Sequence, residues 1–297
     1  MLQWQVMDRR EFIKQMGLGL AGGWALGRLA WPWPARAADP ELRLALLADA
    51  HLKDGNEKRP EATAMARAVA EIRTLEPQPD LVLFAGDLAH RGRPDALDLG
   101  REILSNLPGP VWAVRGEGDH GPGGDSAWVR RFGVPGFSRG YRGAQVIGLD
   151  PALSRTSRGL VFEVGVPQRQ WLARELAKLT PATPLVILSH APLARLFHPW
   201  QQWTGDAPEV IRLLAQFPRV LCMHGHMHRP EVISLAENRK PKTQNHISLP
   251  ATAWPLPQAV QGTPAFWRPG LGPRGCGWAL ATLSPTSLNF QPYLWQS

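Results

Sequence analysis

The most informative segment for the fold is Val220-Leu221-Cys222-Met223-His224-Gly225-His226-Met227-His228. Its first four residues are apolar, and a short apolar run that ends in glycine and histidine is typical of a buried strand that opens into a functional loop. His226 and His228 are separated by one residue, so their imidazoles share one side of an extended chain. Imidazole binds zinc, iron and manganese well. The segment therefore predicts a metal-binding loop at a strand end.

Three other apolar runs end in the same way. Residues 44–48 lead into Asp49-Ala50-His51, residues 81–85 lead into Gly86-Asp87, and residues 185–188 lead into Ser189-His190. The carboxyl ends of strands are where ligands gather in α/β sheets. Four strand ends that carry carboxylate or imidazole groups predict one shared site, in which the two oxygens of Asp87 could bridge two cations.

The remaining chain shows alternating strand and helix patterns up to His228 and short β-like segments after it. This order favours two packed sheets with outer helices in one domain. We expect strands over residues 43–48, 81–85, 111–115, 144–149, 185–188, 220–223, 231–234, 246–249, 278–283 and 288–294, and helices over residues 61–75, 96–107, 168–179 and 209–217.

Composition is that of an ordinary globular protein. The 297 residues are 44% hydrophobic and 20% charged, with a formal net charge of +8. The positive charge suits an anionic substrate, and no basic run or aromatic-basic alternation predicts nucleic-acid binding. Two cysteines, Cys222 and Cys276, make no disulfide framework, and whether they form a single bridge stays open.

The N-terminus has the order of a cleaved signal peptide: charged residues, an apolar stretch and then Ala35-Arg36-Ala37. Arg9-Arg10 followed by Phe-Ile-Lys resembles a twin-arginine signal. We expect residues 1–37 to be removed after export by the twin-arginine machinery and residues 38–297 to form the mature domain. The expected location is the bacterial periplasm or outside the cell, with membrane contact only through the signal segment.

The ordered motifs resemble those of the calcineurin-like metallophosphoesterase superfamily, which has Asp-x-His, Gly-Asp, Gly-Asn-His-Asp/Glu, a lone His and Gly-His-x-His. Four of the five are intact between Leu42 and Leu256, and Gln168-Arg169-Gln170-Trp171-Leu172 resembles a further family element. The resemblance implies a four-layer αββα sandwich, an α/β fold of two mixed sheets flanked by helices. It also implies two divalent or trivalent ions (iron, manganese or zinc). One would be held by Asp49, His51, Asp87 and His228, and the other by Asp87, His190 and His226.

The third motif departs from the family pattern, because Gly116-Glu117-Gly118-Asp119-His120-Gly121 stands after residues 111–115. Without a gap, Glu117 replaces the metal-binding Asn and Gly118 replaces the usual catalytic His. With two residues inserted, Asp119 becomes the ligand and His120 keeps the catalytic role. We favour Glu117 as the ligand by register, with His120 still able to reach the leaving group. Either carboxylate should bind a cation more tightly than an amide does.

These features predict a phosphoesterase that hydrolyses a small-molecule phosphomonoester or phosphodiester by attack of a metal-bridged hydroxide. His120 would serve the leaving oxygen, and His90 would line the pocket. A catalytically impaired metal-binding scaffold of the same fold is the alternative that the altered third motif raises. A zinc amidohydrolase is a third hypothesis, and the lack of eight βα repeats counts against it.

Overall fold

The computed structural model describes residues 29–30, 41–121, 125–156, 159–194, 203–236, 243–253, 276–284 and 287–295. Within these ranges the chain forms two six-stranded mixed sheets and one two-stranded hairpin. The helices that flank the sheets are α2 (Pro60–Arg73), α3 (Pro94–Ser105), α4 (Asp125–Phe132), α5 (Gly165–Leu176) and α6 (Ala207–Leu214), with short 3₁₀ turns η1 (His90–Gly92) and η2 (Glu117–Asp119).

The first sheet combines strands from both ends of the chain. Its spatial order is β1-β14-β13-β2-β3-β4. Strands β2, β3 and β4 are parallel, whereas β13 pairs antiparallel with β2 and β14. The strands are β1 (Leu29–Ala30), β2 (Leu42–Leu47), β3 (Leu81–Ala85), β4 (Val111–Val114), β13 (Gly277–Leu283) and β14 (Ser287–Leu294).

The second sheet has the order β11-β12-β10-β9-β6-β5. Its four central strands are parallel, and the edge strands β5 and β11 are antiparallel to their neighbours. The strands are β5 (Phe137–Tyr141), β6 (Ala144–Leu149), β9 (Leu185–Ser189), β10 (Arg219–His224), β11 (Glu231–Ala236) and β12 (Thr243–Ser248), and the separate hairpin is β7 (Ala152–Thr156) with β8 (Gly159–Glu163).

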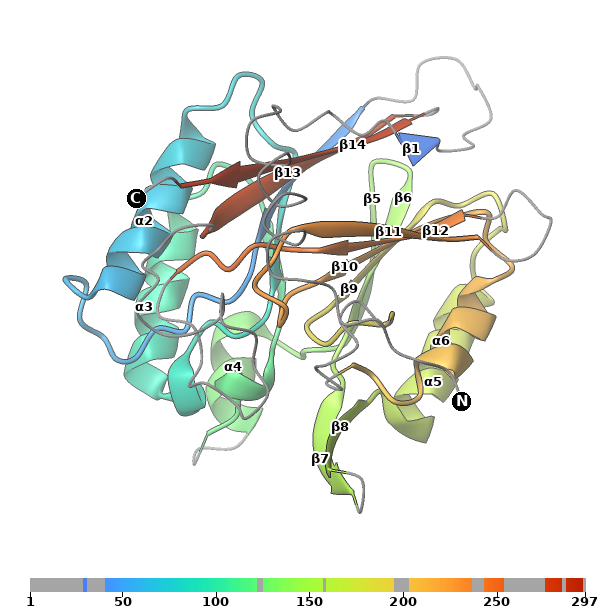
Figure 1. Cartoon of the computed structure of the whole chain (residues 1–297), viewed down its shortest axis with the longest axis horizontal. Coiled ribbons are helices and arrows are strands. Elements are labelled where there is room, and N and C mark those ends of the chain that lie inside the picture. Colours follow the sequence, from blue (N-terminus) through green and yellow to red (C-terminus); the bar gives the residue numbers. More distant parts are fainter. Residues whose placement is uncertain are drawn as a thin grey trace, which may run out of the picture.

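Alternating side chains build the layers. In β2, Leu44 and Leu46 face the second sheet and pack with Val186, Leu188 and Leu221, while Ala45 and Leu47 face α2, α3 and α4. A third apolar cluster joins the second sheet to α5 and α6. Figure 1 shows α2, α3 and α4 on one side of the paired sheets and α5 and α6 on the other. This arrangement confirms the four-layer αββα sandwich predicted from the family resemblance.

The predicted strands and helices are present, most of them with shifted ends. Besides β1 and the two 3₁₀ turns, four further elements were not predicted. Residues 125–132 form α4, residues 137–141 form β5, and residues 152–156 and 159–163 form the β7–β8 hairpin. The terminal strands β13 and β14 belong to the first sheet instead of forming a separate half. Long-range pairing decides this placement, and the local sequence pattern does not contain it.

Several further predictions concern the chain ends and the cysteines. Cys222 and Cys276 are both buried free thiols. Of the expected signal segment, only Leu29–Ala30 is described, as a short strand paired with β14, and the remainder lies outside the described residues. Among the described helices, none combines the length and apolarity needed to cross a membrane.

Candidate metal centre

Strand ends from both sheets meet at one place. In the first sheet, β2 leads to Asp49 and His51, β3 leads to Asp87, and β4 leads to Glu117; in the second sheet, β9 leads to His190, and β10 leads to His226 and His228. The parallel strands of each sheet point their carboxyl ends toward this seam. The structure therefore brings together the seven side chains that we predicted as ligands, and their roles as ligands stay a prediction.

Most of these residues have an unusual backbone conformation. The φ angles of Asp49, His51, Asp87, His226 and His228 lie between 48° and 65°. Non-glycine residues seldom adopt this left-handed region, and such conformations gather at functional sites, where the surroundings enforce them. Each turn directs a side chain into the seam immediately after its strand ends, which a regular extended chain would not do.

Two glycines allow the loops to approach one another. A Cβ atom on Gly86, whose φ is +86°, would lie 2.7 Å from Nδ1 of His190. A Cβ atom on Gly225 would lie 2.5 Å from the carbonyl oxygen of Ala85 and 3.0 Å from Oδ2 of Asp49. Any larger residue at either position would separate the loops, so the glycines of the Gly-Asp and Gly-His motifs have a steric role here.

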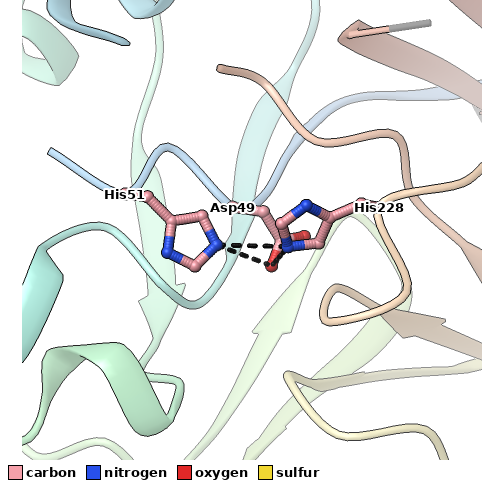
Figure 2. Close-up of side chains that lie close together, drawn as sticks. All are labelled: Asp49, His51 and His228. Carbon is pink, nitrogen blue, oxygen red and sulfur yellow. Dashed lines mark hydrogen bonds and ion pairs between the residues drawn. The ribbon is translucent and has the colours of Figure 1, made fainter. Parts of the chain in front are cut away.

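Asp49, His51 and His228 form the first group of ligand atoms. Nε2 of His228 lies 3.3 Å from Oδ1 of Asp49, and Nε2 of His51 lies 3.1 Å from Nε2 of His228. Figure 2 shows both imidazoles turned toward the carboxylate of Asp49. The backbone N–H of His226 donates to both oxygens of Asp49, at 3.0 and 3.1 Å, and so fixes the carboxylate.

Glu117, His190 and His226 form the second group. The two oxygens of Glu117 lie 2.8 Å from Nε2 of His190 and 3.0 Å from Nδ1 of His226. Nδ1 of His190 donates to the carbonyl oxygen of Ala85 at 2.8 Å, which sets the tautomer and leaves Nε2 free to bind a cation. The ligand atoms within each group lie within 4.8 Å of one another.

Asp87 lies between the two groups. Its Oδ2 is 3.6 Å from Nε2 of His51, and its Oδ1 is 3.6 Å from Nε2 of His190. The backbone N–H of Gly118 donates to Oδ1 at 2.7 Å and holds this orientation. Each oxygen of one carboxylate therefore faces a different group, as a bridging ligand requires.

The electrostatics of the cluster fit cations. Burial, together with the charge of Glu117, raises the pKa of Asp87 well above its ordinary value. Burial also opposes ionisation of Asp49 and Glu117, but His228 lowers the pKa of Asp49, and His226 and His190 lower the pKa of Glu117. Three carboxylates thus share a space with little water, where positive charge would relieve their mutual repulsion.

His51 and His190 differ in their electrostatics. Burial and the neighbouring His228 lower the pKa of His51 to about 3, so its ring is neutral and its lone pair is available. Burial also disfavours the charged form of His190, yet Asp87 and Glu117 outweigh it and raise the pKa of His190 well above its usual value. The two carboxylates therefore favour positive charge at this position, which a bound cation would also supply.

The two alternatives for the third motif lie in different surroundings. Glu117 faces His190 and His226, whereas Asp119 turns away and accepts hydrogen bonds from the backbone N–H groups of Ala89 at 2.8 Å and Gly116 at 2.9 Å. This geometry agrees with the alignment without a gap, in which Glu117 replaces the metal-binding Asn of the family motif. Gly118 then stands where the family carries its usual histidine, and a Cβ atom there would lie 3.0 Å from Oδ1 of Asp87.

The two remaining predicted residues lie outside the ligand groups. His120 follows η2 and has an exposed side chain. Desolvation of its ring by nearby protein atoms and the charge of Arg115 lower its pKa. His90 is exposed in η1, where partial burial and the nearby Arg91 and Lys53 lower its pKa. Their predicted roles at the leaving group and in the pocket wall stay predictions.

Two features beside the site were not predicted. Arg115, directly after β4, is buried and pairs with Asp125 and with both oxygens of Asp150, which follows β6, so this contact ties the two sheets together. The ring of Phe162 in β8 packs edge-on against His226 at 5.0 Å between centroids. The sequence could have pointed to Asp150, because this residue directly follows the predicted strand 144–149. Nothing in the sequence singled out Phe162.

Comparison with characterised proteins gives the same family. Residues 42–230 match the calcineurin-like phosphoesterase family model. The chain is 22% identical over 255 residues to a glycerophosphodiester phosphodiesterase, GpdQ, of Enterobacter lignolyticus, covering 78% of this chain and 84% of that protein. It is 24% identical to a probable GpdQ of Arcobacter nitrofigilis, over 56% of this chain and 63% of that protein. A probable cyclic nucleotide phosphodiesterase of Rhodopseudomonas palustris is 28% identical over 57% of this chain and 64% of its own length.

Solved structures share the fold. A dimetal phosphatase from Danio rerio superposes with a TM-score of 0.64 at 14% identity, covering 84% of this chain and 95% of that chain. GAP50, named as the anchor in the inner membrane complex of Plasmodium, superposes with a TM-score of 0.53 at 13% identity, covering 86% of this chain and 84% of that chain. The family model and the relatives named as phosphodiesterases confirm the predicted class of metal-dependent phosphoric ester hydrolases, and the chain belongs to the calcineurin-like phosphoesterase family.

Proposed function

We propose that this protein is a binuclear metal phosphoesterase that hydrolyses a phosphomonoester or phosphodiester. The observation that carries the proposal is the position of Asp87, whose two oxygens face the two ligand groups at equal distances of 3.6 Å. Such an arrangement suits two neighbouring cations that act together on one phosphoryl group. Family membership and the relatives named as phosphodiesterases support the same reaction class.

Each ligand group would hold one ion. Asp49, His51 and His228 would bind the first, Glu117, His190 and His226 would bind the second, and Asp87 would contact both. When bound, two such ions lower the pKa of water and neutralise charge on the phosphoryl oxygens. The mixture of carboxylate and imidazole ligands suits zinc, manganese or iron.

The protein's own proton donor would act on the leaving oxygen. With Gly118 at the usual histidine position, His120 is the nearest imidazole along the chain, three residues after Glu117. Its lowered pKa favours the neutral ring near pH 7. Because an acid donates best when its pKa lies near the working pH, this assignment predicts that activity rises in mildly acidic solution.

A decisive test uses the purified full chain loaded with manganese, zinc or iron. Wild-type protein should cleave 4-nitrophenyl phosphate or bis(4-nitrophenyl) phosphate. Asp87→Asn and His226→Ala should each lower kcat/KM by at least about 100-fold, since the first removes the charge of the carboxylate between the two groups and the second removes an imidazole. Asp95→Asn provides a matched control, because this exposed carboxylate on α3 pairs only with solvent-facing groups such as Arg93. Absence of hydrolysis of both esters and of a nucleotide panel would overturn the proposal.

A specific observation favours one other function. Gly118 has no side chain with which to assist the leaving group, so the protein could be a metal-binding scaffold with impaired catalysis. That function predicts tight binding of metal without turnover. It also predicts that Glu117→Asn, which restores the family's usual amide, leaves the protein inactive, whereas the enzymatic proposal predicts measurable turnover in the parent chain.

We also propose export through the twin-arginine route to the periplasm, based on Arg9-Arg10 and the apolar stretch that follows. Cell fractionation of the full chain expressed in a bacterium with this pathway tests the proposal. Processed protein should appear in the periplasm, and Arg9→Lys with Arg10→Lys should retain it in the cytoplasm. Unchanged export of the double variant would exclude the twin-arginine route.

A further inference from the structure

One face of the β7–β8 hairpin carries three apolar side chains, the first of which lies beside the candidate metal centre, and Arg155 is the register partner of the last. Leu153 and Phe162 are directly opposed across the two strands, so their side chains share one face. Leu160 lies two residues before Phe162 and therefore falls on the same face. Phe162 is 1% exposed and packs against His226, whereas Leu153 and Leu160 are 38% and 41% exposed.

Exposure of these two leucines is unusual for this chain. The exposed large apolar side chains of the described residues are Val129, Val134, Leu153, Leu160, Val166 and Val232. Both leucines among them lie on this single face, and no other large apolar pair among them shares a strand face. Isolated exposed apolar residues need no explanation, but adjacent ones on an arm beside a reaction centre indicate a binding surface.

The base of the hairpin is held rigidly. Asp206 accepts hydrogen bonds from the backbone N–H groups of Val164 and Gly165, each at 2.9 Å, and pairs with Arg169. The backbone N–H of Gly205 donates to the carbonyl oxygen of Phe162 at 2.6 Å. These contacts fix Phe162 beside His226, while the rest of the hairpin projects from the body of the molecule (Figure 1).

We propose that this face of the hairpin binds the apolar organic group of the phosphoester substrate, which would be an ester of an aliphatic alcohol. The proposal rests on the phosphoesterase function proposed above and specifies its substrate class. Leu153, opposite the buried Phe162, and Leu160 supply the exposed surface, and because two residues of an extended strand span about 7 Å, this surface can contact several methylene groups. A phosphoryl group held near His226 would place its alkyl chain past the buried Phe162 and along the exposed Leu153 and Leu160 in turn.

The test compares alkyl 4-nitrophenyl phosphates from methyl to hexyl with metal-loaded protein. Burying a methylene on one side should raise kcat/KM about twofold, so we expect at least about a tenfold increase from methyl to hexyl. In the double variant Leu153→Ser with Leu160→Ser, the hexyl-to-methyl ratio should fall to about threefold or less. The control double variant Val134→Ser with Val232→Ser changes two other exposed apolar residues away from the hairpin and should keep the parent ratio.

A binding measurement separates this inference from the proposed function. Hexylphosphonate should bind the metal-loaded protein at least about tenfold more tightly than methylphosphonate by calorimetry, and the leucine double variant should lose this preference. Preferential binding without hydrolysis of any ester would refute the phosphoesterase function and support the binding surface. Hydrolysis with no dependence on chain length in the parent protein would overturn the inference and keep the function.

A membrane surface would give a different pattern. If the leucine double variant lost sedimentation with phosphatidylglycerol vesicles while the parent protein showed no chain-length preference for soluble esters or phosphonates, the hairpin would be a membrane contact. That outcome would overturn the inference.

Discussion

Replacing Glu117 by glutamine removes one negative charge from the candidate metal centre and keeps the length of the side chain. Its carboxylate oxygens lie 2.8 Å from Nε2 of His190 and 3.0 Å from Nδ1 of His226, so the change acts first on the second ligand group. The first group, with Asp49 and His51, keeps its own carboxylate. We therefore expect Glu117→Gln to weaken the binding of one ion and to leave the other bound.

The size of the effect follows from these distances. At an effective dielectric constant of about 20, unit charges 2.8 Å apart interact by about 6 kcal/mol. This value is a ceiling, because the Glu117 side chain is 29% exposed and the amide oxygen of glutamine can still bind a cation. We expect the dissociation constant of the second ion to rise by about 100- to 1,000-fold, which corresponds to about 3–4 kcal/mol.

Equilibrium dialysis followed by elemental analysis measures both ions across a range of free manganese or zinc concentrations. Glu117→Gln should bind one equivalent tightly and the second only at much higher concentration. Asp87→Asn should weaken both ions, because its oxygens lie 3.6 Å from a nitrogen of each group. Two ions bound by Glu117→Gln as tightly as by the parent protein, or simultaneous loss of both, would refute this assignment of ligands.

Three further changes test other parts of the structure. Arg115→Met should lower the free energy of unfolding, measured by urea denaturation, by about 3 kcal/mol, because it leaves Asp125 and Asp150 without their buried partner. The control Arg93→Met breaks an exposed ion pair and should lower the free energy of unfolding by less than about 1 kcal/mol. Gly225→Ala should lose metal binding measured by dialysis, because its Cβ would lie 2.5 Å from the carbonyl oxygen of Ala85; normal binding would show that the loops can separate without harm. Burial lowers the pKa of His246 to about 4 in the folded chain, below its ordinary 6.5. As the pH falls, the unfolded chain therefore binds a proton at His246 before the folded chain does. The free energy of unfolding should then fall by up to about 3 kcal/mol between pH 6.5 and pH 4. His246→Gln should flatten this part of the pH profile of stability, and an unchanged slope would contradict the assignment.

Sequence reasoning found the candidate site because its chemistry lies where strands end. Asp49, Asp87, His190 and His226 each come directly after or close to a short apolar run, and parallel strands bring such ends together. The residue pattern therefore predicts both the sheets and the meeting of these side chains. The packing order of the strands was accessible only through the family resemblance.

The sequence left open which carboxylate of the third motif faces the site. Glu117 and Asp119 are two residues apart in a loop with glycine on both sides, and local rules allow either to turn inward. The structure separates them by hydrogen bonding: Asp119 is used by the backbone N–H groups of Ala89 and Gly116. Ala89 lies in the loop after β3 and not in the loop that carries Asp119, so the local sequence around Asp119 does not reveal this donor.

The hairpin and the pairing of the terminal strands were missed for a different reason. Residues 152–156 and 159–163 mix small, charged and apolar side chains and show no regular alternation. The strands β13 and β14 were predicted, but β2, the strand that pairs with β13, lies more than 200 residues earlier in the chain. Pairing over such a distance depends on the whole packed core, which local periodicity does not encode.

The positive φ angles explain why the metal centre needs so large a scaffold. Five predicted ligand residues hold conformations that each cost about 1–3 kcal/mol relative to ordinary backbone, and the carboxylates of two of them, Asp49 and Asp87, are buried. Free energy from elsewhere in the fold must offset this cost. The apolar layer between the sheets supplies it, since each fully buried leucine such as Leu44 or Leu188 contributes about 1.5–3 kcal/mol. The sheets can therefore keep the loops in the strained geometry that brings these side chains together.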